Sequence, residues 1–357
     1  MPEAICAVEA EQAFKNLDTA LQEMPRQMLT FSKSMKSRYV ENALETGSKA
    51  ESKYQTLRNG TKNDAMVYFK GILPVSEMVI SAIDGLFEYF MQLGYDELRW
   101  QLSGMLEEFR NCRELCEMIK TMHEKIMVPL KRREDEAKEV MMELRELQQE
   151  YERKKAVLEK NAATKNKWAF GLMFVPGINL IVSPALMFSA KSDKRDAVLQ
   201  GLQAQTQGAA AMAVSDTLIP ALTGFIEGLG CAAGFFAEME NEIIKCQGRA
   251  DRSDREGMQL TLYKMMGSNA DNIRTKCHAY MKALPDVRTD FEAICTEGTN
   301  TEIDPQYVYN SLRELLNMFQ VLRKPRPEMT AHLKREIKHQ RELACPNQHK
   351  ITWNTEV

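Results

Sequence analysis

Residues 98–158 read LRWQLSGMLEEFRNCRELCEMIKTMHEKIMVPLKRREDEAKEVMMELRELQQEYERKKAVL, and this stretch decides the fold. Along it a seam position recurs at alternating steps of four and three residues, the heptad pattern of a helix that packs lengthwise against other helices. Only His123, Arg133 and Lys154 interrupt the apolar seam. At about 1.5 Å per residue, the pattern predicts one helix roughly 90 Å long, which Pro129 kinks without ending it. The seam positions are 98, 102, 105, 109, 112, 116, 119, 123, 126, 130, 133, 137, 140, 144, 147, 151, 154 and 158.

Helical periodicity continues on both sides of this seam, and no alternating strand pattern accompanies it. Pro25 is expected to bend the first of these helices. A polar stretch at residues 46–63 contains Asn59-Gly60, which is a turn signal. The fold class is therefore all-α, an elongated bundle of long helices with coiled-coil packing and a central hydrophobic tongue or hairpin. The expected flanking helices cover residues 8–45, 64–96, 235–284, 307–322 and 328–344, with polar residues 248–257 loosening the third.

An uncharged segment, WAFGLMFVPGINLIVSPALMFSA at residues 168–190, follows the long helix, and no charge lies between Lys167 and Lys191. About 20 apolar residues suffice to cross a bilayer, and an aromatic residue beside lysines is typical of a membrane boundary. Pro176-Gly177 and Pro184 break the run, which favours a folded tongue or short hairpin over a straight span. The candidate membrane-inserting residues are Trp168, Phe170, Leu172, Phe174, Val175, Ile178, Leu180, Ile181, Val182, Leu186 and Phe188.

A second apolar stretch, residues 205–238, has a different design. Gln205, Asp216, Glu227 and Glu238 are spaced by eleven residues, which places them on one helical face. Asp216, Thr223 and Glu227 are accordingly candidates for lining a pore, since an acidic stripe in lipid would face water. The GxxxG pairs Gly224/Gly228 and Gly230/Gly234 are candidate helix contacts. The alternative is a core helix of a soluble bundle, with a thin polar stripe that faces solvent.

The remaining composition offers no chemistry of another class. The net charge of −3 gives no global attraction to nucleic acid. Phosphate-binding loops, metal-ligand spacings and nucleophile motifs are all absent, so we expect no catalytic residue, cofactor or metal, and no enzyme. The eight scattered cysteines are expected to be reduced. The N-terminus lacks the features of a secretory signal, so we expect a soluble protein, cytoplasmic or released by another route, that is membrane-bound when active.

The order of long helices, a central element of WAFGLMFVPGINLIVSPALMF with SDTLIPALTGFIEGLGCAAGFF, and long helices again resembles a known family. It is similar to the α-helical pore-forming toxins of the cytolysin A, haemolysin BL and non-haemolytic enterotoxin type, including their xenorhabdolysin-like relatives. The resemblance covers roughly residues 10–295. It implies a soluble monomer that holds Trp168–Ala190 as its hydrophobic head and Gln205–Glu238 as the returning limb. At a bilayer the head is exposed and the protomers assemble into a pore.

By this likeness the chain divides into four parts: residues 1–164 and 239–324 as the two halves of the bundle, 165–238 as the membrane-interacting head, and 325–357 as a helix and tail. The implied partners are a lipid membrane and further copies of the same chain, with a second protein component left open and no nucleic acid. Two alternatives remain. One is an intracellular membrane-associated helical protein of the apolipoprotein L type, and the other is a soluble coiled-coil scaffold.

Overall fold

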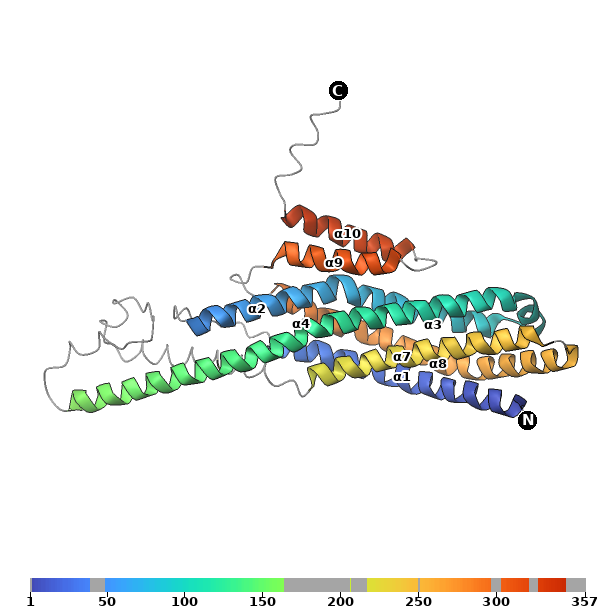
Figure 1. Ribbon diagram of the computed structural model, residues 1–357, viewed down its shortest axis with the longest axis horizontal. Coiled ribbons are helices and arrows are strands. Elements are labelled where there is room, and N and C mark those ends of the chain that lie inside the picture. The colour runs from blue at the N-terminus through green and yellow to red at the C-terminus, as the bar shows by residue number, and fades with distance from the viewer. Residues whose placement is uncertain are drawn as a thin grey trace, which may run out of the picture.

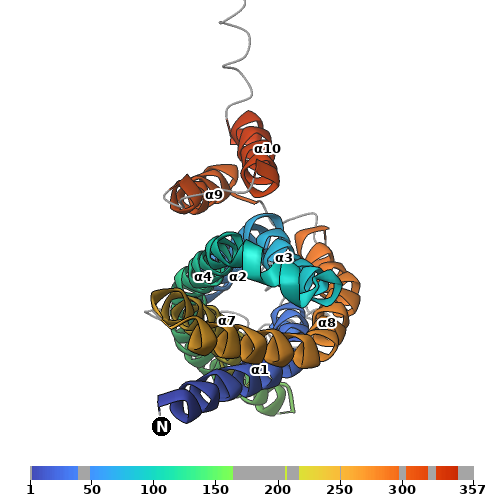
Figure 2. The same cartoon turned by 90° about the vertical axis from the view of Figure 1, so that its right-hand side faces the viewer.

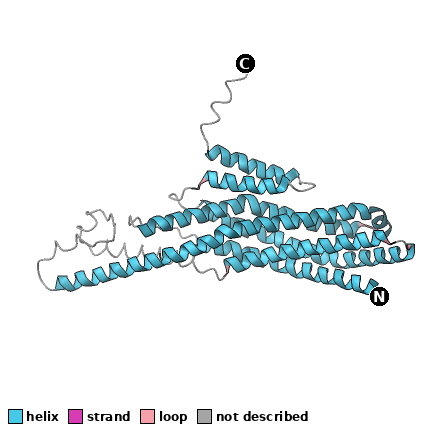
Figure 3. Cartoon of the chain, in the orientation of Figure 1, coloured by secondary structure: helices cyan, strands magenta, loops and turns pink. Residues whose placement is uncertain are grey.

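The computed structural model describes residues 2–38, 49–163, 206, 217–249, 251–296, 303–320 and 327–344. Helices account for almost all of these residues, and none of the described ranges forms a strand, which confirms the all-α fold (Figure 3). One short element, η1, is a π-helix. The elements are α1 (Pro2–Arg38), α2 (Lys49–Val67), η1 (Tyr68–Ile72), α3 (Leu73–Gln92), α4 (Tyr95–Ala163), α7 (Leu218–Gly248), α8 (Arg252–Thr296), α9 (Pro305–Gln320) and α10 (Pro327–Ala344).

The bundle is elongated, and its helices surround a common axis (Figures 1 and 2). Around this ring α1 contacts α7, α7 contacts α4, α4 contacts α3, α3 contacts α8, and α8 contacts α1. Helices α2, η1 and α3 form one rod, so α2 continues the position of α3 along the axis. The pair α9 and α10 lies outside the ring, against α2, η1 and α4. One large apolar cluster fills most of the bundle because the ring helices direct their buried faces to a shared interior, and a smaller cluster of Leu57 and Ala137 lies between α2 and α4.

Helix α4 carries the predicted seam, and at about 1.5 Å per residue its 69 residues span roughly 100 Å. Twelve of the first fourteen seam residues are buried apolar side chains between Leu98 and Leu144. The other two are His123, which is also buried, and Arg133, which is half-buried. The helix continues through Pro129, as expected. Beyond Leu144 the helix extends past the ring, and fewer of the described helices lie beside it there (Figure 1).

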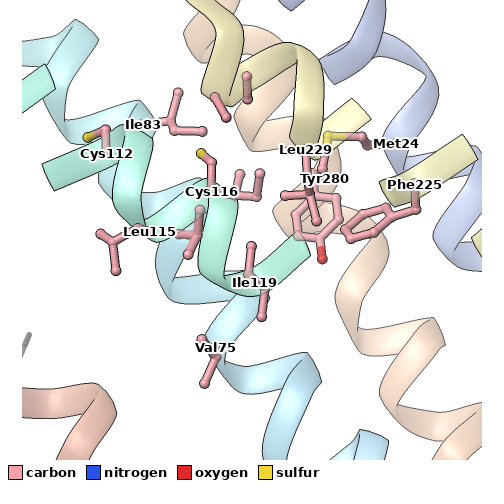
Figure 4. Close-up of a cluster of buried hydrophobic side chains, with 14 of the residues drawn as sticks. Met24, Val75, Ile83, Cys112, Leu115, Cys116, Ile119, Phe225, Leu229 and Tyr280 are labelled. Carbon is pink, nitrogen blue, oxygen red and sulfur yellow. The ribbon is translucent and has the colours of Figure 1, made fainter. Parts of the chain in front are cut away.

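Side chains in the middle of the seam contact more than one neighbouring helix. Cys112 and Cys116 lie among Ile83, Leu115 and Ile119 in the core (Figure 4). Both thiols are buried, and burial raises the pKa of Cys116 well above its ordinary value, because the charged form loses its hydration. They pack as small apolar side chains, which matches the sequence expectation.

The predicted turn at Asn59-Gly60 is wrong, because both residues lie inside α2. Tertiary contact overrides the local signal here. A Cβ atom on Gly60 would collide with the guanidinium group of Arg133 on α4, so a side chain at position 60 would displace that group. The expected polar stretch before residue 64 is therefore helix, and α2 runs directly into η1.

The expected helix at residues 64–96 is interrupted by the π-helix η1, for a reason visible in the sequence. Pro74 has no backbone N–H, so the carbonyl of Lys70 loses its α-helical donor. The local helix widens, and the N–H of Leu73 donates to the carbonyl of Tyr68 five residues earlier. Within the expected loosening at residues 248–257, α7 ends at Gly248 and α8 begins at Arg252.

Two further expectations concern the helix boundaries. Helix α1 continues through Pro25 to Arg38, and residues 39–48 lie outside the described ranges. Helices α9 and α10 form close to the expected ranges of 307–322 and 328–344. Asp304 begins α9 as an N-cap, since its carboxylate accepts hydrogen bonds from the backbone N–H groups of Gln306 and Tyr307. The predicted boundary between parts at residues 238 and 239 falls within α7.

Candidate functional site

The predicted membrane-inserting residues between Trp168 and Phe188 lie outside the described residues, and so does Asp216. The structure describes the two helices that flank this part of the chain. The chain leaves α4 after Ala163, at the projecting end of the longest helix, and enters α7 at Leu218. The start of α7 is held against α1, because the hydroxyl groups of Ser34 and Thr217 lie 2.9 Å apart.

Helix α7 lies in the ring between α1 and α4, and its apolar faces are buried. Phe235 meets Phe14 of α1 edge-on, with their ring centroids 4.7 Å apart. Phe236 faces Phe109 of α4, with a centroid distance of 6.1 Å. Edge-to-face and offset aromatic contacts of this kind add to the burial of the rings themselves. Most of the large apolar side chains of α7 are thus covered by protein in this state, with Ile244 as an exposed exception.

The polar stripe of α7 faces outward. Glu227 is exposed and Thr223 is half-buried. Glu238 is also half-buried, and its carboxylate lies 3.9 Å from the ammonium group of Lys245. A soluble core helix adopts such an arrangement, with a polar stripe at the edge of its buried apolar face. The role of Thr223 and Glu227 as pore-lining residues stays a prediction for another state.

The four glycines of the GxxxG pairs fall into two groups. A Cβ atom on Gly224 would collide with the side chain of Gln27, and one on Gly228 would lie 3.0 Å from Met24 Cγ. These two glycines let α7 approach α1 closely, in the way that small residues bring helices together. A Cβ atom on Gly230 or Gly234 would meet no neighbour within 4 Å among the described residues, so this second pair faces open space. A contact of this second pair with another chain stays a prediction.

Two helical stretches are long and apolar enough to cross a membrane by length and composition alone, Ser52–Gln92 and Leu218–Gly248. Within the most apolar part of each, 67% and 56% of the residues are buried in the bundle. A buried core helix of a soluble protein meets the same test. Both stretches already have protein partners, which distinguishes them from an apolar segment that needs lipid to cover it.

A buried carboxylate that the sequence analysis did not single out fastens α7 to α4. Glu240 accepts a hydrogen bond from Arg110 Nε at 2.6 Å, and Arg113 Nε lies 3.4 Å from its other oxygen. Glu240 is 9% exposed, so both of its oxygens depend on these two guanidinium groups. An acidic residue among the apolar positions of a helix indicates such a pair. The partner cannot be predicted from neighbouring residues, because it lies on another helix.

His123, which interrupts the seam, is fully buried inside the ring of helices. Its Nδ1–H donates to the carbonyl of Ile119 at 2.8 Å, so Nε2 accepts from the hydroxyl of Tyr68 at 3.1 Å. The centroid of its imidazole also lies 4.9 Å from the ring centroid of Phe225 on α7. Burial lowers the pKa of His123 from 6.5 to about 4, because the charged form would be unsolvated. This neutral imidazole joins α4, η1 and α7 in one packed cluster.

A second buried polar cluster lies where α9 meets the bundle. Asp64 is fully buried, and it accepts from Tyr307 Oη at 2.6 Å and from Arg133 Nε at 3.3 Å. Burial raises the pKa of Asp64, and Tyr307 and Arg133 partly oppose that shift. Arg133, the second polar interruption of the seam, is thereby explained as the partner of this carboxylate. Within the described ranges no group of three His, Cys, Asp or Glu residues is placed to hold a metal ion.

Comparison with known proteins gives one weak likeness. No protein-family model matches this chain, and no curated protein matches it. Among solved structures, the chain is similar to the SmhB pore of the tripartite α-pore-forming toxin Smh from Serratia marcescens, at 12% identity and a TM-score of 0.35. The likeness covers 92% of this chain and 99% of that one. A TM-score of 0.35 is too low to assign a fold, so the all-α assignment rests on the helices themselves.

Proposed function

We propose that this protein is a soluble helical bundle that inserts its uncharged central segment, residues 168–190, into a lipid bilayer and assembles with further copies into a pore. The observation that carries the proposal is the 23-residue run without charge between Lys167 and Lys191, connected to the projecting end of α4. A run of this length needs to be covered by protein or lipid, because exposed apolar area of this size leads to aggregation.

The burial of the other apolar helices supports the choice of this segment. Helices α3 and α7 already cover their apolar faces within the ring, so a bilayer offers them no gain unless the bundle first opens. The central segment is flanked by basic residues on both sides, Lys165 and Lys167 before it and Lys191 and Lys194 after it. Such residues favour the lipid headgroup region and define the two ends of an inserted element.

The proposal assigns a soluble state and a lipid-bound state to one chain, and lipid shifts the equilibrium towards the second. In the lipid-bound state the acidic stripe with Asp216, Thr223 and Glu227 lines the water-filled path. Gly230 and Gly234, which face open space here, then provide a contact between protomers. A second protein component belongs to this proposal as an optional partner.

The test is dye release from liposomes of mixed neutral and anionic lipids by the purified full chain. A Leu180→Asp, Ile181→Asp variant places two charges in the uncharged segment and is expected to abolish release. The matched control is Val128→Asp, Met142→Asp, which adds two charges at exposed positions of α4 and is expected to leave release unchanged. Circular dichroism and gel filtration establish that both variants remain folded and soluble.

The outcomes separate the classes of function. Release by the native chain and by the α4 control, but not by the segment variant, supports insertion of residues 168–190. Binding to liposomes without release favours a membrane-associated helical protein that forms no pore. Neither binding nor release, with or without a cell lysate as a source of a second component, favours a soluble scaffold.

A further inference from the structure

The pair α9 and α10 covers the one place where the α2–η1–α3 rod has a broken hydrogen-bond ladder. Pro74 removes the donor that the carbonyl of Lys70 would have in an α-helix. In the structure this carbonyl accepts from His332 Nε2 of α10 at 2.8 Å. A side chain 262 positions away therefore satisfies a backbone acceptor that the proline leaves without its usual partner.

Gly71 in the π-helix leaves the space in which α9 contacts η1. A Cβ atom on Gly71 would lie 2.6 Å from Leu312 Cδ2 and 2.9 Å from Leu315 Cδ1, both on α9. Only glycine leaves room for these two leucines to reach the backbone of η1. Leu312 and Leu315 are buried, although α9 lies on the outside of the ring. The fit joins α9 to η1 at the same turn where His332 joins α10 to it.

Polar contacts also join α9 to the bundle beside these leucines. Tyr307 donates to Asp64, and the backbone N–H of Asp304 donates to Asn63 Oδ1 at 2.9 Å. Lys125 Nζ of α4 lies 2.5 Å from a carboxylate oxygen of Glu314. An interface with a small apolar centre and a polar rim resembles those between domains that separate and rejoin.

The hairpin is also a packed unit in its own right. Val308, Phe319 and Leu333 are fully buried, and α9 packs most extensively against α10. The two helices can therefore leave the bundle together with much of their mutual packing kept. Separation would break the contacts to Lys70, Gly71 and Asp64, which lie in or near η1, together with the ion pair between Lys125 of α4 and Glu314.

We infer that α9–α10 is a latch that docks reversibly on the π-helix η1 and holds the α2–η1–α3 rod in its bundle conformation. While the hairpin is docked, the proline-interrupted turn is capped and its glycine is covered, so the rod is rigid. When the hairpin leaves, the rod has a weak point at its middle and the bundle can rearrange. This inference rests on the proposed function for its purpose, since a soluble bundle that inserts into lipid needs an element that releases it.

Hydrogen exchange of the full-length chain in solution tests the latch without reference to membranes. His332→Phe keeps an aromatic ring but removes the donor to the Lys70 carbonyl. We expect exchange in η1, α9 and α10 to rise about tenfold, while α1, α7 and α8 keep their protection. The matched control is His339→Phe, an exposed position on the same helix, which is expected to exchange like the native chain.

A disulfide provides the opposite perturbation. Gly71→Cys with Leu312→Cys places two thiols at this contact, and the shortened side chain at position 312 removes the closer of the two atoms that a Cβ at 71 would meet, so that only Leu315 has to shift. Oxidation is expected to slow exchange in α9 and α10 and to suppress dye release from liposomes, and reduction is expected to restore both.

Each outcome decides between the two proposals. If His332→Phe raises exchange at the latch but no protein releases dye, the latch stands and the pore proposal fails. If dye is released equally in the oxidised and reduced states of a double variant shown by mass spectrometry to be cross-linked, the hairpin is not a latch for insertion. If His332→Phe exchanges like the native chain, the latch inference is overturned whatever the liposomes show.

Discussion

Acid is expected to destabilise this bundle through one residue, His123. Its imidazole is fully buried on α4, where Nδ1–H donates to Ile119 and Nε2 accepts from Tyr68. The ring also contacts Phe225, and burial is the largest cause of its lowered pKa. Protonation would put a charge into this apolar cluster and turn Nε2 from an acceptor into a donor, so the hydroxyl of Tyr68 would lose that acceptor.

The size of the effect follows from the two pKa values. The pKa of His123 is 6.5 in an exposed reference state and about 4 in the folded bundle. Because the folded value is the lower one, stability is fully present above the unfolded pKa and falls as pH decreases through the window from 6.5 to 4. At about 1.36 kcal/mol per pKa unit, the full loss is about 3 kcal/mol, and about 2 kcal/mol of it has occurred by pH 5.

The assay is urea unfolding followed by circular dichroism at pH 7.5 and at pH 5, on the native chain and on His123→Leu. In the variant the Tyr68 hydroxyl keeps an acceptor, because Met28 Sδ lies 3.1 Å away. Other titrating groups contribute equally to both proteins. Asp64 is one of these, and its raised pKa makes its own contribution favour the fold in acid. The difference between the two pH dependences therefore isolates His123.

We expect the native chain to lose about 2 kcal/mol more than His123→Leu between the two pH values. His339→Leu, at an exposed position, serves as the control and should lose as much as the native chain. If His123→Leu and the native chain lose the same free energy of unfolding, the imidazole is hydrated or paired in a way the structure excludes. The reasoning from burial would then be refuted.

Three further outcomes follow from individual contacts. Ala20→Cys with Gly228→Cys should cross-link α1 to α7, since the two Cβ positions lie 3.8 Å apart. Oxidation should then block dye release from liposomes. Release from the cross-linked form would show that these helices need not separate. Gly60→Ala should lower the free energy of unfolding by about 1–3 kcal/mol in urea titration, although alanine favours helix, because its methyl group displaces Arg133; an increase in stability would contradict the close approach. Glu227→Gln should reduce cation preference in the reversal potential across a planar bilayer, and an unchanged potential would remove this residue from the pore lining.

The long seam shows what local pattern can predict. Positions from Leu98 to Leu144 are buried as the four-three spacing indicates, since a helical residue's neighbours three and four positions away share its face whatever it packs against. The same reasoning predicted the ends of α9 and α10 to within two residues. It could not say whether the seam faces one helix or several, and here α4 contacts α2, α3 and α7.

The error at Asn59-Gly60 shows where local pattern fails. Both residues favour turns in isolation, but Gly60 is selected by the guanidinium group of Arg133, which belongs to another helix. The expected helix at 64–96 passed over Pro74, and the capping of the Lys70 carbonyl by His332 depends on α10, which lies far away in the sequence. For α7, the eleven-residue spacing predicted a polar stripe, and the structure places Glu227 of that stripe in solvent.

From the sequence alone it follows that this protein is helical, that its longest helix carries an apolar seam over about 60 residues with three polar interruptions, and that one central segment carries no charge. These are properties of neighbours along the chain, so periodicity and composition carry them. Only the tertiary structure decided that α7 lies between α1 and α4, that His123 and Asp64 are buried with specific partners, and that α9–α10 covers η1. Those contacts join residues far apart in the sequence, and their energies depend on burial and close approach, which no single helix contains.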